Sequence, residues 1–573
     1  MTWKTATCLA MIGALCGCSG NAPATSAAPQ ALSSDPFAAQ PDATSAWLAR
    51  LEPRSADGSG NNQTNPEWGA ANQPFLRHTT LGYGDGVGSM GGAQRPNPRD
   101  ISNAVNAQIR LVPNRAHISD LVWQWGQFID HDITLIANAN PPENIDIPIP
   151  AGEPLFDPQG TGTQVLPMLR SEHMTMPDGH REQMNHNTAF VDASMVYGSS
   201  DTRAAALRAN DGTGHLRTSD GNLLPFNDRG QDNAGPGGGN APGDTTLFLG
   251  GDIRVNEQVG LTAMQTLWMR EHNRIADRLS AREPWLTDDQ LYQGARALVG
   301  AEIEKITYQD FLPILVGDLK PYNGYDETVN PGIENLFASA LYRVGHTLLS
   351  PQLQVLAPDG TPILDGGLSL RDAFFTPDQF IRGGLMEPLL RGQASQVAQE
   401  VDCMVVDPVR NFLFGQPGQG GLDLPSLNIQ RGREHGLPSY TQARLDMGLS
   451  PATSFADISS DPEVQQRLAS VYASVDDVDV WVGAISEDHV DGALVGELIA
   501  TVVRDQFERL RDGDRFYYEN ALPRHLVRWV RHRTLSKVIR DNTGIGDELQ
   551  RNAFYAPWPD DDHAANPAGG NAR

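Results

Sequence analysis

The hydrophobic residues of this chain recur mainly at helical spacing. Between residues 117 and 136, apolar side chains fall three and four positions apart, at Ile118, Leu121, Val122, Trp125, Phe128 and Ile129. This period is typical of an amphipathic helix. Similar patterns predict helices over 257–280, 287–307, 333–349, 462–475, 494–511 and 524–540. Strand signals are sparse, and the clearest, over 353–356, is weak, so we expect a mainly α fold with few short strands.

The chain from residue 66 to residue 558 contains no linker and no internal repeat, which predicts one large domain. Two stretches inside it, 140–166 (rich in Pro) and 227–245 (rich in Gly, Asn and Asp), lie between helical patterns and are expected to be long surface loops. Residues 18–65 are rich in Ala, Ser, Pro, Asn and Gly, a composition that favours a flexible tether. A disordered tail is expected over 559–573.

The first residues have the pattern of an export signal. Lys4 precedes an apolar run over 6–15 that is too short to span a bilayer and is typical of a signal-peptide core. The following Leu15-Cys16-Gly17-Cys18 resembles a bacterial lipobox, so residues 1–17 would be removed and Cys18 lipidated; an ordinary secretory signal is the alternative. We therefore expect a secreted or cell-envelope protein that touches the membrane only through this anchor.

Composition excludes several classes of protein. The net charge of −27 disfavours non-specific binding to nucleic acid or anionic lipid. Of the four cysteines three lie in the first twenty residues, which leaves Cys403 alone in the folded part. The sequence is therefore neither a disulfide framework nor a zinc ribbon, and if Cys18 is lipidated no disulfide can form within one chain.

Three polar residues of the first predicted helix share one face. Gln127, Asp130 and His131 are three and four residues apart, opposite most of the apolar stripe. Such a face either meets solvent or lines a pocket, and spacing alone favours solvent.

Three other segments carry chemistry that is ambiguous when each is taken alone. Residues 188–194 offer oxygens at alternate positions, as calcium requires, or form a polar turn. Arg254 and Glu257, in the segment 250–257, have the spacing of a surface ion pair. His346, in Tyr-Arg-Val-Gly-His-Thr, is either a structural histidine or a metal ligand.

Taken together and in order, five motifs resemble those of the animal-type haem peroxidases, the peroxidase–cyclooxygenase superfamily, over roughly residues 66–555. They are 126–132, 188–194, 250–257, 342–347 and 427–438. The resemblance implies haem b as cofactor and hydrogen peroxide as substrate. It implies that His131 is the distal acid–base and that Gln127 hydrogen-bonds water or a small anion. By the same resemblance Arg254 stabilises charge as the O–O bond breaks, and His346 binds the iron.

The resemblance also implies roles for the surrounding residues. Asp130 and Glu257 would form ester links to the haem. Asn428 would accept the second ring N–H of His346, and Arg343 and Arg431 would pair with the haem propionates. Calcium would be bound by Asp132, Thr188, the Phe190 carbonyl, Asp192 and Ser194. His272 would be a structural, buried histidine.

Two departures from relatives narrow the expected chemistry. Gln258 stands where the mammalian neutrophil enzyme has methionine, so no sulfonium link can form and chloride oxidation is disfavoured. Arg343 occupies the position at which cyclooxygenases and fatty-acid dioxygenases carry a radical-forming tyrosine, three residues before the proximal histidine. Tyr342 is one residue out of register, which argues against lipid oxygenation.

The sequence therefore predicts a haem peroxidase that oxidises bromide, iodide, thiocyanate or phenolic donors. Two alternatives stay open. One is a fatty-acid dioxygenase on the same fold; the other is an adhesion or matrix-crosslinking protein with a largely structural haem, which the lack of an Arg-Gly-Asp tripeptide disfavours. The sequence leaves the preferred donor and the oligomeric state undetermined.

Overall fold

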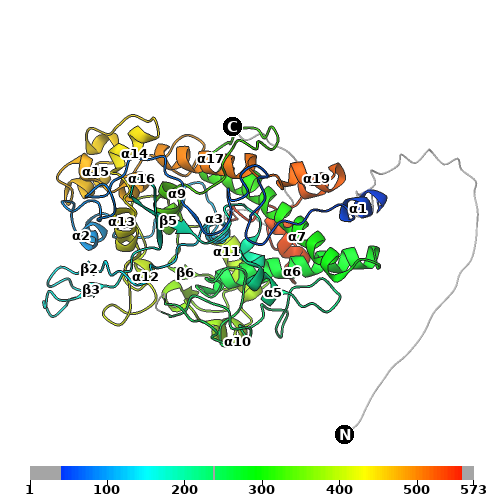
Figure 1. Cartoon of the computed structure of the whole chain (residues 1–573). Coiled ribbons are helices and arrows are strands. Elements are labelled where there is room, and N and C mark those ends of the chain that lie inside the picture. Colours follow the sequence, from blue (N-terminus) through cyan, green and yellow to red (C-terminus); the bar gives the residue numbers. More distant parts are fainter. Residues whose placement is uncertain (1–40, 237–238, 558–573) are drawn as a thin grey trace, which may run out of the picture.

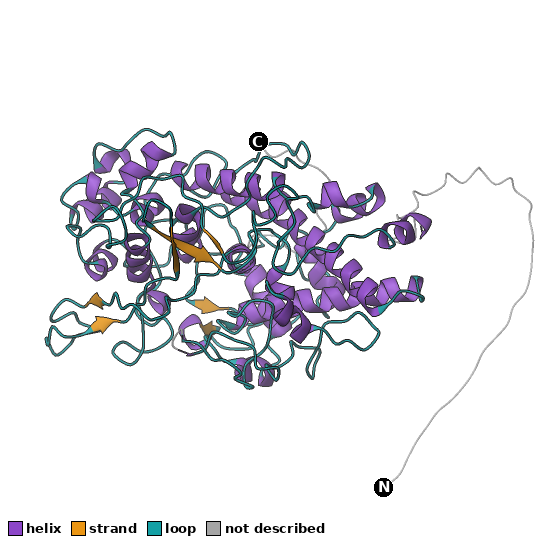
Figure 2. Ribbon diagram, in the orientation of Figure 1, coloured by secondary structure: helices purple, strands orange, loops and turns teal. Residues whose placement is uncertain are grey.

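The computed structural model describes residues 41–236 and 239–557 (Figure 1). The expected signal peptide, lipobox and C-terminal tail lie outside these residues. Helices dominate the described part (Figure 2), which confirms the expected mainly α class. The α-helices are α1 (Pro41–Leu48), α2 (Pro98–Ala104), α3 (Leu121–Ile133), α4 (Ser194–Tyr197), α5 (Asp201–Leu207), α6 (Val259–Arg282), α7 (Asp288–Lys305), α8 (Leu312–Val316), α9 (Asn335–Ser339), α10 (Pro377–Arg382), α11 (Met386–Ser395), α12 (Asp407–Arg410), α13 (Leu424–Glu434), α14 (Tyr440–Asp446), α15 (Pro462–Ala469), α16 (Val480–Ile485), α17 (Glu497–Asp512), α18 (Tyr518–Ala521), α19 (Arg524–Val530) and α20 (Leu535–Asn542).

Shorter elements complete the chain. The helical turns are the π-helix η2 (Ile306–Phe311) and the 3-10 helices η3 (Leu341–His346), η4 (Leu370–Asp372), η5 (Phe455–Asp457) and η6 (Val475–Asp477). The strands are β1 (Gln73–Pro74), β2 (Ile147–Pro148), β3 (Val165–Leu166), β4 (His173–Thr175), β5 (Arg181–Asn185), β6 (Gln352–Leu353) and β7 (Leu368–Ser369). They pair antiparallel in the order β1-β5-β4 and as the pairs β2–β3 and β6–β7. The expected loop 140–166 therefore contains one short ladder, in which Ile147 is opposite Leu166.

Three of the expected helices are interrupted. The 333–349 segment forms α9 and then, after Ala340 at φ −137°, the 3-10 helix η3. The 524–540 segment breaks between α19 and α20, where the Thr534 side chain accepts from the Lys537 N–H and starts a new helix. Residues 462–475 form α15 only as far as Ala469. An apolar period near 3.6 residues does not record these local breaks, because each fragment keeps the same buried side.

The N-terminal part of the folded domain begins before residue 66. Within the expected tether, residues 41–48 form α1, and the following segment packs on the domain. Arg54 forms ion pairs with Asp514 at 2.6 Å and Glu304 at 3.1 Å, and Asn61 donates to the same aspartate at 2.7 Å. The tether was predicted from the average composition of the segment. Composition gives no information on single residues, such as Arg54 and Asn61, that bind partners far away in the sequence.

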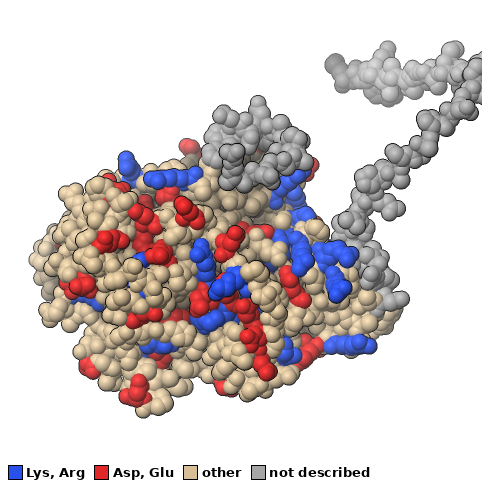
Figure 3. All heavy atoms as spheres, turned by 90° about the horizontal axis from the view of Figure 1, so that it is seen from above, with Lys and Arg blue, Asp and Glu red and all other residues tan. Residues whose placement is uncertain are grey.

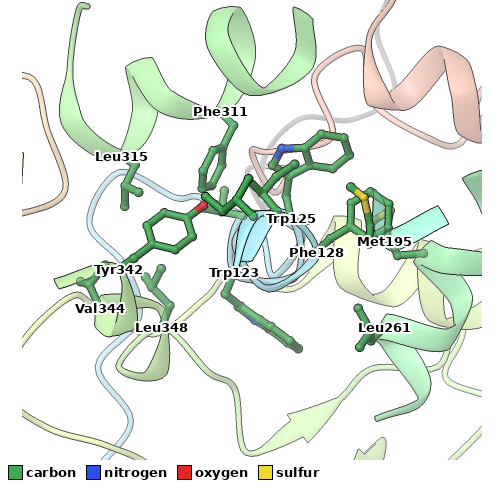
Figure 4. Close-up of a cluster of buried hydrophobic side chains, with 14 of the residues drawn as sticks. Trp123, Trp125, Phe128, Met195, Leu261, Phe311, Leu315, Tyr342, Val344 and Leu348 are labelled. Atoms are coloured by element: carbon green, nitrogen blue, oxygen red, sulfur yellow. The ribbon is translucent and has the colours of Figure 1, made fainter. Parts of the chain in front are cut away.

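Helix α3 is held through its apolar side. Figure 4 shows Trp125 and Phe128 of α3 packed with Phe311 and Met195 from neighbouring elements. Trp125 and Phe128 are fully buried, and the Trp125 ring lies 5.8 Å from that of Trp268 in α6. Large aromatic side chains bury much apolar area and tolerate few orientations. The packing therefore fixes the rotation of α3, and with it the direction of its polar face.

The surface seen in Figure 3 carries acidic and basic side chains side by side. In the described part of the chain no helix combines the length and the apolar character needed to cross a membrane. Cys403 is a free thiol in the core, and burial raises its pKa to about 12. It is therefore protonated, and chemically inert, at neutral pH.

A buried ion-pair cluster joins three helices behind the α3 packing. Arg533 contacts Glu302 of α7 at 2.6 Å, Glu271 of α6 at 3.0 Å and Asp541 of α20 at 2.7 Å. Both glutamate side chains are completely buried. One guanidinium thus compensates charges from elements that lie far apart in sequence.

We predict that Arg533→Met lowers the free energy of unfolding by about 3 to 5 kcal/mol, because it leaves the Glu302 carboxylate buried without its cation, whereas Glu271 keeps its ion pair with Arg274. Thermal unfolding followed by circular dichroism measures the loss. The control is Arg382→Met, which breaks an ion pair with Asp378 whose side chains are both 78% exposed, and should cost less than about 1 kcal/mol. Equal losses for the two variants would contradict the prediction.

Candidate active site

The polar face of α3 turns into the protein, so the solvent interpretation of its spacing is wrong for His131. His131 is only 3% exposed, whereas Gln127 and Asp130 on the same face are partly exposed. The Asn187 side chain donates to the backbone carbonyl of His131 at 2.8 Å and holds this end of the helix. A buried imidazole beside partly open polar groups is the arrangement of a site, not of a solvated face.

Arg254 reaches this face from the loop before α6. Its guanidinium forms a two-point ion pair with Asp252, with both N–O distances 2.8 Å, and donates to the Thr134 carbonyl at 2.5 Å. The third nitrogen lies 3.5 Å from an Asp130 oxygen. Arg254 holds the pKa of Asp252 well below its usual range, so this carboxylate stays charged. The guanidinium is therefore fixed in position beside His131.

His131 has acidic neighbours but no close partner for its ring. Its Nδ1 lies 3.7 Å from Asp252, and its Nε2 lies 3.6 Å from Glu257. The buried Nδ1 has no hydrogen-bond partner among the described residues. Burial, and then the charge of Arg254, lowers the His131 pKa to about 3. The imidazole is therefore neutral at neutral pH and can accept a proton.

The two carboxyls proposed as haem partners are held in a protonatable state. Burial raises the Glu257 pKa to about 7, although Arg254 opposes the shift. Gln127 donates to Glu257 Oε2 at 3.3 Å. Burial also raises the pKa of Asp130, which accepts from the Thr134 hydroxyl at 2.9 Å. Both side chains are partly exposed, 24% for Glu257 and 33% for Asp130, so they are open to a ligand.

His346 ends η3, which packs against α3. It is partly exposed, and a Cβ added at the neighbouring Gly345 would meet open space. The Asn428 amide donates to His346 Nδ1 at 2.8 Å, and the Asn428 carbonyl oxygen accepts from Arg343 at 3.1 Å. The expected pairing of His346 with Asn428 is present, but the amide presents its NH₂ to the ring. A half-turn of the amide would present the oxygen that a ring N–H donor needs, and it would give up the bond from Arg343.

The two arginines expected near the propionates differ in how free they are. Arg431 is occupied by Glu434 at 3.1 Å, the Ser171 hydroxyl at 2.7 Å and a backbone carbonyl. Arg343 has no carboxylate within ion-pair distance in the described chain, and burial beside Arg431 lowers its pKa to about 10. Arg343 thus remains a cation at neutral pH and is the less compensated of the two. Its charge, like that of Arg254, acts on Asp130, which lies between the two sides of the site.

The expected calcium residues converge behind the distal helix. Asp132 accepts from the Ser194 N–H at 2.5 Å, and the Ser194 hydroxyl donates to the Asp132 carbonyl at 2.6 Å. Burial and the neighbouring Asp192 raise the Asp132 pKa well above its usual range. Buried oxygens of Asp192 (Oδ2) and Thr188 (Oγ1) have no hydrogen-bond partner in the described part, and Phe190 is fully buried in the same loop. Two neighbouring buried carboxylates, with one carboxylate oxygen and one hydroxyl left without a partner, fit a divalent cation.

The sequence motifs therefore contribute to neighbouring parts of the structure. Two sets of residues at the site were not predicted from the sequence. Asp252, within the 250–257 motif, was not singled out, although an acid two residues before an arginine is a signal for such a pair. Gln124 and Gln393 accompany Gln127 and Gln258 by hydrogen bonding, for which spacing gave no indication. His272 is structural as expected, because its ring contacts the Tyr197 hydroxyl at 2.8 Å and the Gly214 carbonyl at 2.9 Å.

Known proteins are similar to this chain in sequence and in fold. The sequence profile described as animal haem peroxidase matches residues 53–554. Peroxinectin A of Dictyostelium discoideum is 34% identical over 517 residues, which cover 87% of this chain and 95% of that protein. Peroxidasin of Drosophila melanogaster is 35% identical and matches 87% of this chain but only 36% of its own length.

Solved structures agree. Peroxidase A from Dictyostelium discoideum superposes with a TM-score of 0.83 at 33% identity, over 88% of this chain and all of the other. A fatty acid alpha-dioxygenase of Arabidopsis thaliana shares the fold, with a TM-score of 0.74 at 22% identity over 91% and 86% of the two chains. The fold and the relatives define an oxidoreductase of the peroxidase class. The chain belongs to the animal haem peroxidase family.

We predict that Asp252→Asn lowers kcat/KM for hydrogen peroxide by about 10²-fold, since the loss of one charge-assisted contact displaces Arg254. Steady-state peroxidase assays on haem-loaded protein measure the effect. Asp228→Asn, which removes the charge from an exposed aspartate that pairs with Arg217, is the matched control and should change little. Unchanged turnover in Asp252→Asn would show that Arg254 does not depend on this pair.

Proposed function

We propose that this protein is a haem peroxidase that uses hydrogen peroxide to oxidise small anions, such as bromide, iodide and thiocyanate, or phenolic donors. The observation that carries the proposal is the distal arrangement, a buried neutral His131 beside an Arg254 that Asp252 holds in place. An uncharged imidazole accepts a proton from peroxide, and a fixed guanidinium favours the negative charge that develops as the O–O bond breaks.

Residues of α3, of η3 and of the loop before α6 would together hold a haem. His346 would bind the iron, with Asn428 rotated so that its oxygen accepts the second ring N–H. Arg343, which no carboxylate compensates in the described chain, would meet a propionate, and Arg431 would be shared with Glu434. Asp130 and Glu257, both partly exposed and with raised pKa values, would be available for ester links. When bound, the haem supplies the redox centre that receives electrons from the donor.

The distal residues then divide the work. His131 takes the proton from peroxide and returns it to the departing oxygen. Arg254 stabilises that oxygen while Asp252 keeps the guanidinium oriented. Gln127 offers an N–H to water or to a small anion. Because Gln258 cannot form a thioether-derived link, bromide, iodide and thiocyanate are favoured over chloride as anionic donors.

Lipid oxygenation on the same fold is disfavoured by the residues before His346. Arg343 is engaged with Asn428 and the Ala338 carbonyl. The Tyr342 ring stacks on Phe337 with centroids 4.8 Å apart, and its hydroxyl points into the apolar cluster (Figure 4). No tyrosine is therefore placed three residues before His346 to abstract hydrogen from a fatty acid.

Location and anchoring rest on the sequence alone. Cys18 and the segment before it would export the protein and attach it to the cell envelope. A purely adhesive or matrix role is the remaining alternative, and it differs from the proposal in one measurable respect: it does not need His131.

We predict that His346→Ala abolishes stable haem binding, whereas His131→Ala keeps the haem and loses about 10²- to 10⁴-fold in peroxide turnover. The Soret absorbance and its retention after acid-acetone extraction report the cofactor and its covalent attachment. Assays with bromide, thiocyanate and a phenol report turnover. His272→Gln, at a structural histidine, controls for the loss of an imidazole. A wild-type protein that stays colourless with haemin, or full activity in His131→Ala, would refute the proposal.

We further predict that calcium stabilises the fold through the 188–194 loop. At a free calcium concentration one hundred times its Kd, bound calcium adds about 2.7 kcal/mol to the free energy of unfolding. Chelation by EGTA should lower the melting temperature of the wild type, and re-addition of calcium should restore it. Asp132→Asn should melt at the same temperature with or without EGTA. Calcium content per chain, measured by atomic absorption, tests the site even if that variant misfolds.

A further inference from the structure

Four glutamine side chains form a connected chain next to the distal residues. Gln124 and Gln127 belong to α3, Gln258 is the N-cap residue of α6, and Gln393 belongs to α11. Gln124 and Gln393 are completely buried and Gln258 is 2% exposed, whereas Gln127 is partly open to the site. Burying three amides costs free energy unless their N–H and C=O groups are hydrogen-bonded. The fold must therefore hold these side chains in positions where they bond to one another.

The direction of the Gln258 amide is fixed by the backbone. The Gly260 N–H donates to Gln258 Oε1 at 2.6 Å. A backbone N–H can only donate, so a flipped amide would set two donors against each other. Gln258 Nε2 must therefore point the other way, where it donates to Gln124 Oε1 at 2.6 Å and to Gln127 Oε1 at 3.0 Å.

This direction passes to the residue that faces the site. The Gln127 carbonyl oxygen accepts from Gln258 at 3.0 Å and, over a longer 3.4 Å, from Gln124 Nε2. Its NH₂ group is therefore turned toward Glu257, whose Oε2 it meets at 3.3 Å. The same Glu257 oxygen lies 3.6 Å from His131 Nε2. The distal side is thus presented with an N–H donor, and not with a carbonyl oxygen.

We propose that Gln258 is a positioning residue that sets the amide direction of Gln127, so that the distal side presents a donor to a small anion. The inference rests on the proposed function, and it names the class of ligand that the site selects. An anion such as thiocyanate would accept a hydrogen bond from the Gln127 NH₂ in addition to the contact with Arg254. If the Gln127 amide were reversed, its carbonyl oxygen would repel the anion instead.

The glycine at position 260 leaves the space that the network occupies. A Cβ at position 260 would lie 2.6 Å from Gln393 Nε2, 2.7 Å from Gln124 Oε1 and 2.9 Å from Gln258 Oε1. Gln393 also donates to Gln124 Oε1 at 3.0 Å, which keeps that oxygen directed at the network. Glycine at 260 therefore allows the three amides to meet, and the first turn of α6 to supply the N–H that orients them.

Two substitutions separate the hydrogen-bond direction from simple packing. Gln258→Glu keeps the acceptor for Gly260 but turns a second oxygen toward Gln127, which would draw its NH₂ away from the site. Gln258→Met keeps the volume and removes both groups, so that only the longer bond from Gln124 still holds the Gln127 amide. Gln265→Met is the matched control, because Gln265 is a buried glutamine of the same helix outside the network.

The experiment is an equilibrium titration of the haem-loaded protein with thiocyanate, followed by the change in Soret absorbance. We expect the Kd to rise by about 10- to 100-fold in Gln258→Glu, as for the loss of a hydrogen bond to a charged group, and by less in Gln258→Met. Gln265→Met should bind like the wild type. Equal haem content in all proteins shows that the fold and the cofactor site are retained.

A double-mutant cycle tests whether Gln258 acts through Gln127. In a Gln127→Leu background, Gln258→Glu should change the Kd no further. If Gln258→Glu still raises the Kd in the Gln127→Leu background, the added charge acts directly on the anion. If Gln258→Glu alone leaves the Kd unchanged, Gln258 does not orient Gln127. Either result overturns the inference, whereas the proposed function stands as long as the wild type turns over peroxide. A wild type that binds no haem would overturn both.

Discussion

The two-point ion pair between Arg254 and Asp252 is the constraint on which the distal side of the protein depends. It lies in the loop before α6 and is tied to the end of α3 by the bond from Arg254 to the Thr134 carbonyl. The loop and the helix therefore cannot shift independently. Since Asp252 remains ionised, the guanidinium is compensated from behind and can present its charge toward His131 at no further cost in buried charge.

The fold itself does not decide the chemistry, because peroxidases and fatty acid dioxygenases share it. Individual residues at the site do. Arg343 extends toward Asn428, while the neighbouring Tyr342 is committed to an aromatic stack. The glutamine chain also acts through individual residues. The Gly260 N–H at the start of α6 orients the Gln258 amide, and Gln258 in turn orients the N–H donor of Gln127 on α3. Amides as buried as these depend on one another for hydrogen bonds, so the orientation of one determines that of the next.

Much of this arrangement could be read from the sequence, and the failures have physical causes. The apolar period over 117–136 predicted α3. The ordered motifs singled out His131 and Arg254, which lie together beside Asp252, and His346, which ends the η3 helix that packs against α3. The break at Ala340 was missed because an α-helix and a 3-10 turn bury the same side over so few residues. The Asn428 amide direction depends on Arg343, 85 positions away. Arg54 was lost in a Gly- and Ser-rich stretch because its partner Asp514 lies 460 positions further on.

The part of the chain that the structure describes is already folded at residue 41, in α1, which limits how far the enzyme could lie from a membrane. Were Cys18 lipidated, only residues 19–40 would separate the acyl chains from the folded body. Even a fully stretched backbone of that length reaches only about 75 Å, and a coiled one far less. If the site oxidises small anions as proposed, its products would then be released near the lipid surface, and the first molecules they meet would be those of the surrounding envelope.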